Sequence, residues 1–454
     1  MAALRRELGT FSATSIVVGG IIGSGIFFGP QEIAALQPYG LTILLVWLVA
    51  GLISLLGALS VAELGAMLPR SGGFYVYLRE AYGPLPAFLT GWATLIVSDG
   101  LAAVVVVFGT FANFAAPVPG GAPAWAVLLV AALTVPNLLG IKRGAGVQNA
   151  STILKVTALG ALVLVGLLAG ARARGLDPLL PPGGLGPGLA GVFTIALLPA
   201  LFAYDGWFYA ARVAEEVRDP GRALPRALLL GTALVTVVYM AVNLVYVGVL
   251  GPQGLAQVAQ GQGAAVAGQE SPALAVASSV LGPAAVTLVV AGVLVSTAGA
   301  SNTSMLTAPR IFFAMARDGV FFARFARIHP RWGTPHVAIL FHAAVTMLLA
   351  ATGTFVQLIL ISTVATFLFS ALAVGAVIKL RRERPDAPRP YKVPGYPWVP
   401  LAFIALALVF LAAAAVAQPL VTGAFLLLLA AGVPLCWAFQ RRAPRREVVL
   451  ADRA

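Results

Sequence analysis

Long apolar runs alternate with short polar stretches along the whole chain. Runs of about 20 residues are long enough to span a bilayer as helices. They predict twelve transmembrane helices, at residues 11–36, 41–66, 85–115, 124–140, 148–170, 190–213, 224–250, 274–306, 335–352, 355–379, 398–417 and 419–440. The pattern therefore predicts an all-α integral membrane protein with a single transmembrane domain over residues 1–454. Because the number of spans is even, both termini are expected on the same side of the membrane.

The first apolar segment is rich in glycine where it should cross the middle of the bilayer. Four glycines stand in residues 19–25, together with Ser24. Glycine costs about 1 kcal/mol relative to alanine inside a helix, and unpaired backbone groups are tolerated in a membrane only where they face protein or a water-filled cavity. We therefore expect a helix that is interrupted at residues 23–25 and resumes near Ile26, with an N-terminus that attracts anions. Close helix packing is the alternative, since glycines four residues apart also permit it.

The sixth apolar segment is interrupted in a similar way, because Pro199 and Gly206 bracket a short polar patch. It follows the first segment by five helices, so a five-helix repeat would cross the membrane in the opposite direction. Interrupted helices at corresponding positions of two inverted halves indicate the binding site of a transporter. The sequence predicts two inverted five-helix repeats, at residues 11–170 and 190–379, followed by two extra helices at 398–440.

The composition and the distribution of charge agree with this topology. The chain is 60% hydrophobic and only 10% charged, whereas soluble domains carry about 25% charged residues. All but three of its 29 lysines and arginines fall on one side of the predicted membrane; Arg172 and Arg174 lie on the other side and Lys155 lies within a helix. The positive-inside rule makes the crowded side cytoplasmic. We expect a multi-pass protein of the cell membrane with both termini in the cytoplasm, and no nucleic-acid partner despite the net charge of +13.

Residues for metal or thiol chemistry are scarce. Cys436 is the only cysteine, so no intramolecular disulfide can form, and His329, His336 and His342 lack ligand spacing to a second ligand. An enzyme would need a metal or nucleophile constellation, and a channel would need repeated pore motifs or rings of like charge. The sequence provides neither, so both classes are less favoured than a transporter. No metal and no cofactor are expected.

The two interruptions would together form a cavity near the membrane midplane. Exposed N–H groups at residues 23–26 would bind a carboxylate, and carbonyl groups near Phe202 and Ala203 would accept hydrogen bonds from an ammonium group. Such opposed ends fit a zwitterionic α-amino acid. Ser24 would add a hydroxyl contact, and Phe202 and Trp207 would shape the pocket for the side chain.

Three acidic residues lie within the apolar segments, where buried acids are costly and usually functional. Asp205 either caps a half-helix N-terminus or contacts the substrate. Glu63, near the cytoplasmic end of the second helix, is expected to pair with Arg70 or with another arginine of that side. Asp99, in the third helix, receives no assignment from the sequence.

Lys155 lies in the predicted fifth helix, about seven residues from its cytoplasmic end. Its side chain would either extend to the membrane surface or point inward to a site that would otherwise hold a sodium ion. Burial disfavours the charged form of a lysine, so Lys155 could also carry a transported proton. Ser296 and Thr297 begin a polar stripe in the eighth helix, which either faces Lys155 and the first helix or joins neighbouring helices.

The loop after the sixth helix is densely charged and contains Glu215, Glu216 and Arg218. Salt bridges from this loop to arginines of residues 310–331 would close a cytoplasmic gate. The alternative is a solvated loop, in which charges contribute little.

These stretches together resemble the amino acid–polyamine–organocation superfamily, and within it the L-type amino-acid transporter branch. The resemblance runs from the first to the tenth predicted helix. It is carried by residues 23–27, 62–64, 69–73, 75–83 and 202–207, and by Lys155, Glu215, Glu216, Asp219, Pro220, Leu224 and Pro225.

The resemblance implies sodium-independent transport of amino acids, often by obligatory exchange, in a fold of two inverted five-helix repeats plus two helices. It places the substrate's carboxylate and amino groups on the unwound parts of helices 1 and 6, and it matches Lys155 to a lysine that occupies the place of a sodium ion. The expected substrate-binding residues are Ile22, Gly23, Ser24, Gly25, Ile26, Phe202, Ala203, Tyr204, Asp205, Gly206 and Trp207.

Animal members of this branch pair with a heavy subunit through an extracellular cysteine between the third and fourth helices, and this chain has no cysteine there. It therefore resembles the stand-alone bacterial members, including serine/threonine exchangers, and is expected to work as a monomer. We expect an exchanger of small neutral L-amino acids that works by alternating access; a proton-coupled symporter that uses Lys155 is the alternative. A cationic substrate would need a second acid in the cavity, where only Asp205 and Asp99 are available.

Overall fold

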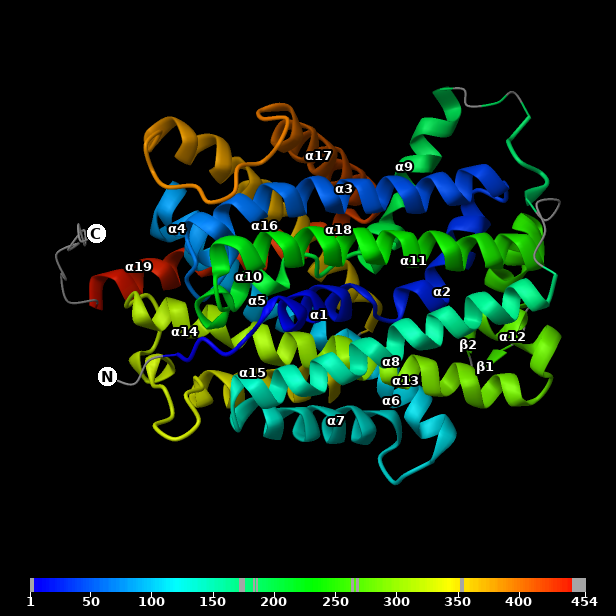
Figure 1. Ribbon diagram of the computed structural model, residues 1–454, viewed down its shortest axis with the longest axis horizontal. Helices are drawn as coiled ribbons and strands as arrows, with labels where there is room; N and C mark the ends of the chain where they lie inside the picture. The colour runs from blue at the N-terminus through cyan, green and yellow to red at the C-terminus, as the bar shows by residue number, and fades with distance from the viewer. Residues whose placement is uncertain are drawn as a thin grey trace.

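The computed structural model describes residues 4–170, 176–182, 184, 187–262, 265–266, 269–351 and 355–442. Most helices lie side by side along the longest axis of the molecule (Figure 1). The first half contains α1 (Thr10–Ile21), α2 (Gly25–Leu36), α3 (Gly40–Met67), α4 (Phe74–Tyr82), α5 (Pro84–Ile96), η1 (Ser98–Gly100), α6 (Leu101–Ala115), α7 (Gly121–Leu138) and α8 (Ile141–Leu168). The second half contains α9 (Pro187–Ala203), α10 (Tyr209–Arg212), η3 (Ala214–Glu216), α11 (Pro220–Gln257), η4 (Val258–Gln262), β1 (Ala265–Val266), β2 (Gln269–Glu270), α12 (Pro272–Leu281), α13 (Ala284–Thr307), α14 (Pro309–Arg317), η5 (Ala323–Ala326), α15 (His336–Ala351), α16 (Phe355–Glu383), α17 (Trp398–Ala417), α18 (Pro419–Ala430) and α19 (Gly432–Arg442).

Helices occupy each of the twelve apolar segments predicted from the sequence. Within the described ranges, nine helices are long and apolar enough to cross a membrane, and α1 with α2 forms a broken span that bends by 40°. The apolar parts of α5, α9, α12 and α15 are shorter. The all-helical membrane fold is thus confirmed, whereas its division into two inverted repeats stays a prediction.

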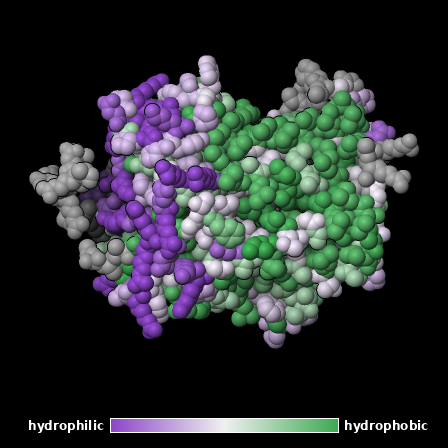
Figure 2. Space-filling model, in the orientation of Figure 1, coloured by the Kyte–Doolittle hydropathy of each residue, from purple (hydrophilic) through white to green (hydrophobic). Residues whose placement is uncertain are grey.

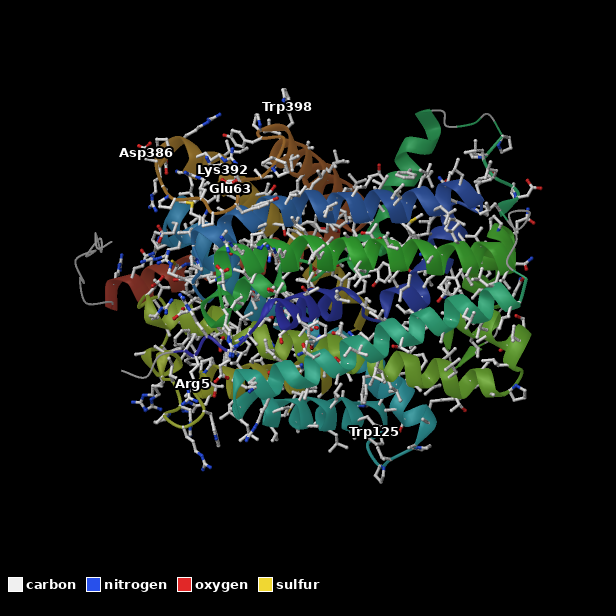
Figure 3. The ribbon with its side chains drawn as sticks, in the orientation of Figure 1. Arg5, Glu63, Trp125, Asp386, Lys392 and Trp398 are labelled. Carbon is white, nitrogen blue, oxygen red and sulfur yellow. The ribbon has the colours of Figure 1, made fainter. Side chains whose placement is uncertain are left out.

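Charge gathers at one end of the molecule, which we call the basic end and which carries α4, α14 and α19. Hydrophilic surface covers this end and apolar surface covers most of the remaining visible face (Figure 2). Arg5 and Lys392 lie at the basic end, as does the acidic Asp386 (Figure 3). Arg172 and Arg174, which the sequence places on the opposite side, lie outside the described residues.

The centre of the bundle is formed around α1, which packs against α11, α8 and α13. Beside it, the buried ring of Trp47 meets Tyr239 edge to face at 5.4 Å, and Tyr204 meets Tyr239 at 5.0 Å. Large rings fill the space next to the glycine-rich helix because glycine itself contributes no side-chain volume. On this side the end of α1 therefore faces protein rather than lipid, as unpaired backbone in a membrane requires.

The third segment is not the continuous helix that the sequence predicts. It divides into α5, η1 and α6, because Ser98, Asp99 and Gly100 all have positive φ angles of 47°, 58° and 72°. L-residues rarely adopt this left-handed conformation, and a helix cannot continue through it.

Other boundaries also differ from the prediction, among them those of the eighth and fifth segments. The eighth segment is two helices, α12 and α13, because Gly282 at a φ of 53° ends the first of them. α8 begins at Ile141 rather than at residue 148, so Lys155 lies further from the start of the helix than predicted.

Candidate functional site

The first helix is broken where its glycines predict. α1 ends at Ile21 and α2 begins at Gly25, and Ile22 between them has extended backbone with a ψ of 97°. A β-carbon at Gly25 would lie 2.6 Å from the Cβ and 2.8 Å from the Cα of Ala203, so only glycine allows this approach. In the described part of the chain, the N–H groups of Gly23, Ser24 and Gly25 donate to no protein acceptor.

The sixth segment is broken at the same level. α9 ends at Ala203 and α10 begins at Tyr209. Gly206 lies between them with a φ of 107°, and a β-carbon on it would lie 2.8 Å from the carbonyl carbon of Gly20. The two breaks are therefore in direct backbone contact, and both predicted interruptions are confirmed.

Three side chains satisfy the carbonyl groups that the break leaves at the end of α1, where the last carbonyls of a helix lack intrahelical partners. Lys155 Nζ donates to Gly19 O at 2.7 Å and to Ile22 O at 2.6 Å. Ser296 Oγ donates to Gly23 O at 2.8 Å. The hydroxyl of Tyr239 lies 3.1 Å from the carbonyl oxygens of both Ile21 and Ala203.

The position of Lys155 decides between its structural alternatives. Its side chain is only 1% exposed, so the alternative in which it extends to the membrane surface is wrong. Ser296 of the predicted polar stripe contacts the same break, whereas Thr297 Oγ1 donates to Val293 O of its own helix at 2.7 Å. Whether these residues couple transport to an ion stays a prediction.

A cavity opens beside the two breaks, with a volume of about 50 Å³ for the centres of water molecules. Its lining includes six of the predicted substrate-binding residues: Gly23, Ser24, Gly25, Phe202, Ala203 and Asp205. The rest of its lining consists of Gly20, Ile21, Asp99, Gly100, Leu101, Val104, Tyr209, Ala300, Ser304 and Ser362.

The other five predicted residues do not line this cavity in the described structure; they are Ile22, Ile26, Tyr204, Gly206 and Trp207. Trp207 packs instead against Phe403, with ring centroids 5.8 Å apart, and against Phe74 at 6.3 Å. Tyr204 belongs to the aromatic core. Ile22 and Gly206 shape the breaks through their backbone.

Asp99 is a cavity residue whose partners could not be named from the sequence. Arg212 binds its carboxylate with both terminal nitrogens, at 2.5 and 2.7 Å, and Ser304 Oγ donates to it at 2.9 Å. The available signal was the polar run at residues 98–100 within an otherwise apolar segment. Arg212 gave no such signal, because it is one of many arginines near a helix end.

Asp205 also faces this cavity. One of its oxygens accepts a hydrogen bond from Thr366 Oγ1 at 3.3 Å. The other oxygen, Oδ1, is buried and finds no partner among the residues that the structure describes. A buried carboxylate oxygen without a donor is unusual in proteins, so Asp205 is a candidate binding residue of this cavity.

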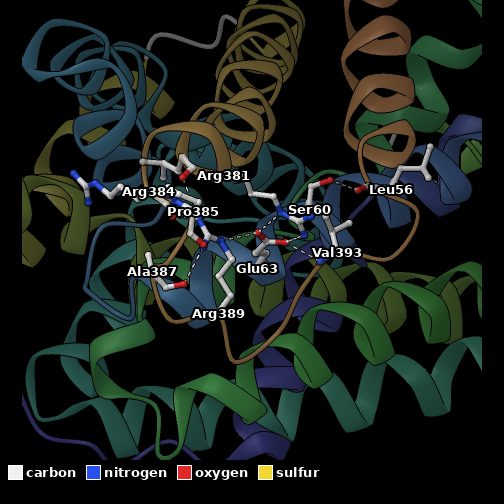
Figure 4. Close-up of polar contacts among 10 residues, drawn as sticks. Leu56, Ser60, Glu63, Arg381, Arg384, Pro385, Ala387, Arg389 and Val393 are labelled. Atoms are coloured by element: carbon white, nitrogen blue, oxygen red, sulfur yellow. Dashed lines mark hydrogen bonds and ion pairs between the residues drawn. The ribbon is translucent and has the colours of Figure 1, made fainter. Parts of the chain in front are cut away.

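Glu63 anchors the segment that joins α16 to α17 at the basic end (Figure 4). Its carboxylate accepts hydrogen bonds from Arg381 at 2.8 and 2.5 Å and from the backbone N–H of Val393 at 2.7 Å, and Arg389 lies 3.4 Å away. The expected pairing with Arg70 is wrong, because Arg70 pairs with Glu80. The alternative of another arginine from the same side is confirmed.

The charged loop after α10 makes the salt bridges that the sequence predicts. Glu216 binds Arg310 at 2.9 and 3.1 Å, with both side chains buried, and Glu215 binds the more exposed Arg317 at 3.0 Å. Arg218 does not join them, because its Nε donates to the carbonyl of Arg6 at 3.3 Å. The alternative of a merely solvated loop is therefore wrong for Glu216.

Glu216→Gln is expected to destabilise the protein by about 3–5 kcal/mol, because it leaves the guanidinium of Arg310 buried without a counter-charge. Glu215→Gln is the matched control: its salt bridge is exposed, and such pairs contribute at most about 1 kcal/mol. Thermal unfolding of both variants in detergent measures the difference. Equal loss of stability in the two variants would show that burial of the Glu216–Arg310 pair does not increase its contribution to the free energy of unfolding.

A membrane-spanning helical bundle in which two broken helices meet at a small polar cavity has the architecture of a membrane transporter. The sequence model of the amino acid permease family matches residues 8–436. The chain belongs to this family, whose members are transporters rather than enzymes, and the resemblance to the amino acid–polyamine–organocation superfamily is confirmed.

Individual relatives cover almost the whole chain. The serine/threonine exchanger SteT of Bacillus subtilis (strain 168) is 30% identical over 450 residues, which cover 97% of this chain and 98% of SteT. Large neutral amino acids transporter small subunit 2 of Mus musculus is 33% identical over 445 residues, 95% of this chain and 81% of the relative. The b(0,+)-type amino acid transporter 1 of Mus musculus is 32% identical over 424 residues, 92% of this chain and 84% of the relative.

Proposed function

We propose that the protein is a sodium-independent exchanger of small neutral L-amino acids that works by alternating access. The observation that carries this proposal is the unpaired backbone N–H groups of Gly23, Ser24 and Gly25 at the start of α2, beside a cavity. The N-terminus of a half-helix with free N–H groups is a binding site for a carboxylate. The free oxygen of Asp205 and the carbonyl end of α9, across the same cavity, are acceptors for the amino group.

The contacts of Lys155 support independence from sodium. Its ammonium group donates hydrogen bonds to the carbonyl oxygens of Gly19 and Ile22, at the end of a half-helix. Unwound carbonyl groups and half-helix C-terminal ends are the ligands that coordinate sodium in transporters with broken helices. A permanently attached cation at this point would replace the ion.

The size and lining of the cavity support small neutral substrates. Its volume of about 50 Å³ leaves room for only a few water molecules beside Leu101, Val104 and Phe202. One of its two carboxylates, that of Asp99, is already paired with Arg212. The name of SteT, a serine/threonine exchanger, agrees with small substrates.

Alternating access requires that the cavity open to each side in turn. We propose that residues 11–170 and 190–379 form two inverted repeats that move against each other, with helices 398–440 outside them. The pairs of Glu216 with Arg310 and Glu215 with Arg317 would then hold the gate closed at the basic end. The positive-inside rule makes this end cytoplasmic in the cell membrane, with both termini there.

We further propose that the chain works as a monomer without a heavy subunit. Its only cysteine, Cys436, is buried in α19. A disulfide to a partner subunit would need an accessible thiol, and the sequence provides none.

The experiment is uptake of labelled serine, alanine, leucine and arginine into liposomes that contain the purified protein. Each uptake is measured with and without unlabelled amino acid inside, with sodium replaced by choline, and with and without a pH gradient. Serine and alanine uptake that requires internal amino acid and ignores both ions is expected. Uptake into empty liposomes driven by protons would instead establish the second candidate, a proton-coupled symporter, which the burial of Lys155 beside the break favours. Uptake of none of the four would refute the substrate class.

A further inference from the structure

The break in the third segment places one charged side chain in an unusual position. Ser98 and Asp99 both adopt the left-handed backbone conformation, which L-residues avoid and which persists only where the surroundings enforce it. The hydroxyl groups of Ser98 and Thr346 hydrogen-bond at 2.5 Å, which fixes the turn against α15. Strained backbone of this kind is concentrated at functional sites.

The turn directs Asp99 to α10, where it forms a buried ion pair with Arg212. The two side chains are 8% and 7% exposed, and both terminal nitrogens of the guanidinium contact the carboxylate. The guanidinium also lies over the rings of Phe208 and Tyr209, 5.1 and 4.5 Å from their centroids. These contacts fix the orientation of the guanidinium, and the carboxylate of Asp99 balances its charge.

The ion pair lies in the wall between two cavities. Asp99 and Ser362 line both the cavity at the helix breaks and a second cavity of about 30 Å³, whereas Arg212 lines only the second. The second cavity is otherwise lined by Thr90, Thr94 and Thr366, by apolar residues of α4, α5 and α16, and by Val97 and Phe208. The carboxylate thus faces the candidate substrate site, and the guanidinium occupies the space behind it.

We infer that Arg212 is a specificity-determining residue that excludes cationic side chains from the substrate cavity; this inference rests on the proposed function. The guanidinium neutralises Asp99 from behind, so the carboxylate at the wall of the substrate cavity is not free to pair with a substrate ammonium or guanidinium group. A second cation beside it would meet like charge at low dielectric, where repulsion is strong. Without Arg212, two carboxylates without a cationic partner, Asp99 and Asp205, would line the cavity, and the space vacated behind Asp99 would adjoin it.

The test is Arg212→Ala, which removes the cation and vacates its space. The ratio of arginine uptake to serine uptake is expected to rise about tenfold or more over wild type, since a pocket that gains an unpaired polar partner changes its discrimination by such factors. Arg212→Lys keeps the charge and is expected to keep the wild-type ratio. The double variant Asp99→Asn/Arg212→Ala has the same space but lacks the carboxylate that Arg212 neutralises, and should show no gain.

An unchanged ratio in a folded Arg212→Ala, or an equal gain in the double variant, would overturn the inference. Should Arg212→Ala not fold, Asp99→Asn tests the same pair from the other side: it leaves the guanidinium bare, so glutamate should compete with serine uptake more strongly than in wild type. Unchanged competition would overturn the inference as well.

A binding measurement separates this inference from the proposed function. Agmatine, a cation without a carboxylate, is expected to raise the unfolding temperature of Arg212→Ala and not that of wild type. This readout needs no transport, so it decides the role of the ion pair even if wild type takes up no amino acid, a result that would refute the proposed function alone. Equal response of both proteins to agmatine would contradict the inference.

Discussion

Gly25→Ala is expected to reduce amino-acid uptake by about 100-fold or more. The added β-carbon would lie 2.8 Å from the Cα of Ala203, a backbone atom that cannot move away as the end of a side chain could. The start of α2 and the end of α9 must then separate, which displaces the free N–H groups from the acceptors opposite them. A displacement of about 1 Å at a binding site can cost 100-fold in rate.

Gly29→Ala is the matched control for this variant. It lies one turn further along α2, and its β-carbon would make ordinary contacts with Trp47, the nearest at 3.4 Å. Uptake by Gly29→Ala should stay close to wild type. A folded Gly25→Ala protein that also transports at the wild-type rate would remove the helix breaks from the substrate site.

Lys155→Met is expected to reduce uptake by about tenfold to 100-fold. Methionine keeps much of the length of the side chain but removes the ammonium group, so Gly19 O loses its donor and Ile22 O keeps only the longer contact from Ser296 at 3.3 Å. Hydrogen bonds to charged groups contribute about 1.5–3 kcal/mol each. The end of α1 should therefore lose its fixed position beside the cavity.

Lys142→Met is the control, because it is the same substitution in an exposed position of the same helix, α8. Uptake in liposomes, with and without a pH gradient, measures both variants. Loss of a response to the pH gradient in Lys155→Met alone would support the proton-coupled alternative. Wild-type uptake and pH response in Lys155→Met would show that the lysine contributes only to packing.

The two helix breaks at the site could be predicted because their cause is local. Glycines and a proline within apolar segments weaken a membrane helix wherever they stand, and the structure has breaks at Ile22 and between Ala203 and Tyr209. Much of the candidate site could be predicted for the same reason, since backbone groups at the breaks form a large part of it. Side chains near the breaks are harder to predict: Trp207 lies within the second break, but the turn directs its ring to Phe403.

The third break could not be predicted, because its cause lies far away in the sequence. Ser98 and Asp99 hold their left-handed conformation beside Thr346 and Arg212, which are 248 and 113 residues from them. The partner of Glu63 was uncertain for the same reason, since Arg381 is 318 residues away. Local patterns show that a polar residue needs a partner, but only the packed fold selects which one.

The two broken helices share one hydrogen-bond donor, the hydroxyl group of Tyr239. A phenol has one proton to donate, and its oxygen lies at the same distance, 3.1 Å, from the last carbonyls of α1 and α9. The proton can turn from one carbonyl to the other by rotation about a single bond, while the ring stays packed against Trp47. One side chain can therefore donate to the end of either half-helix without moving its ring, so the loss of one of these hydrogen bonds can be offset by the other.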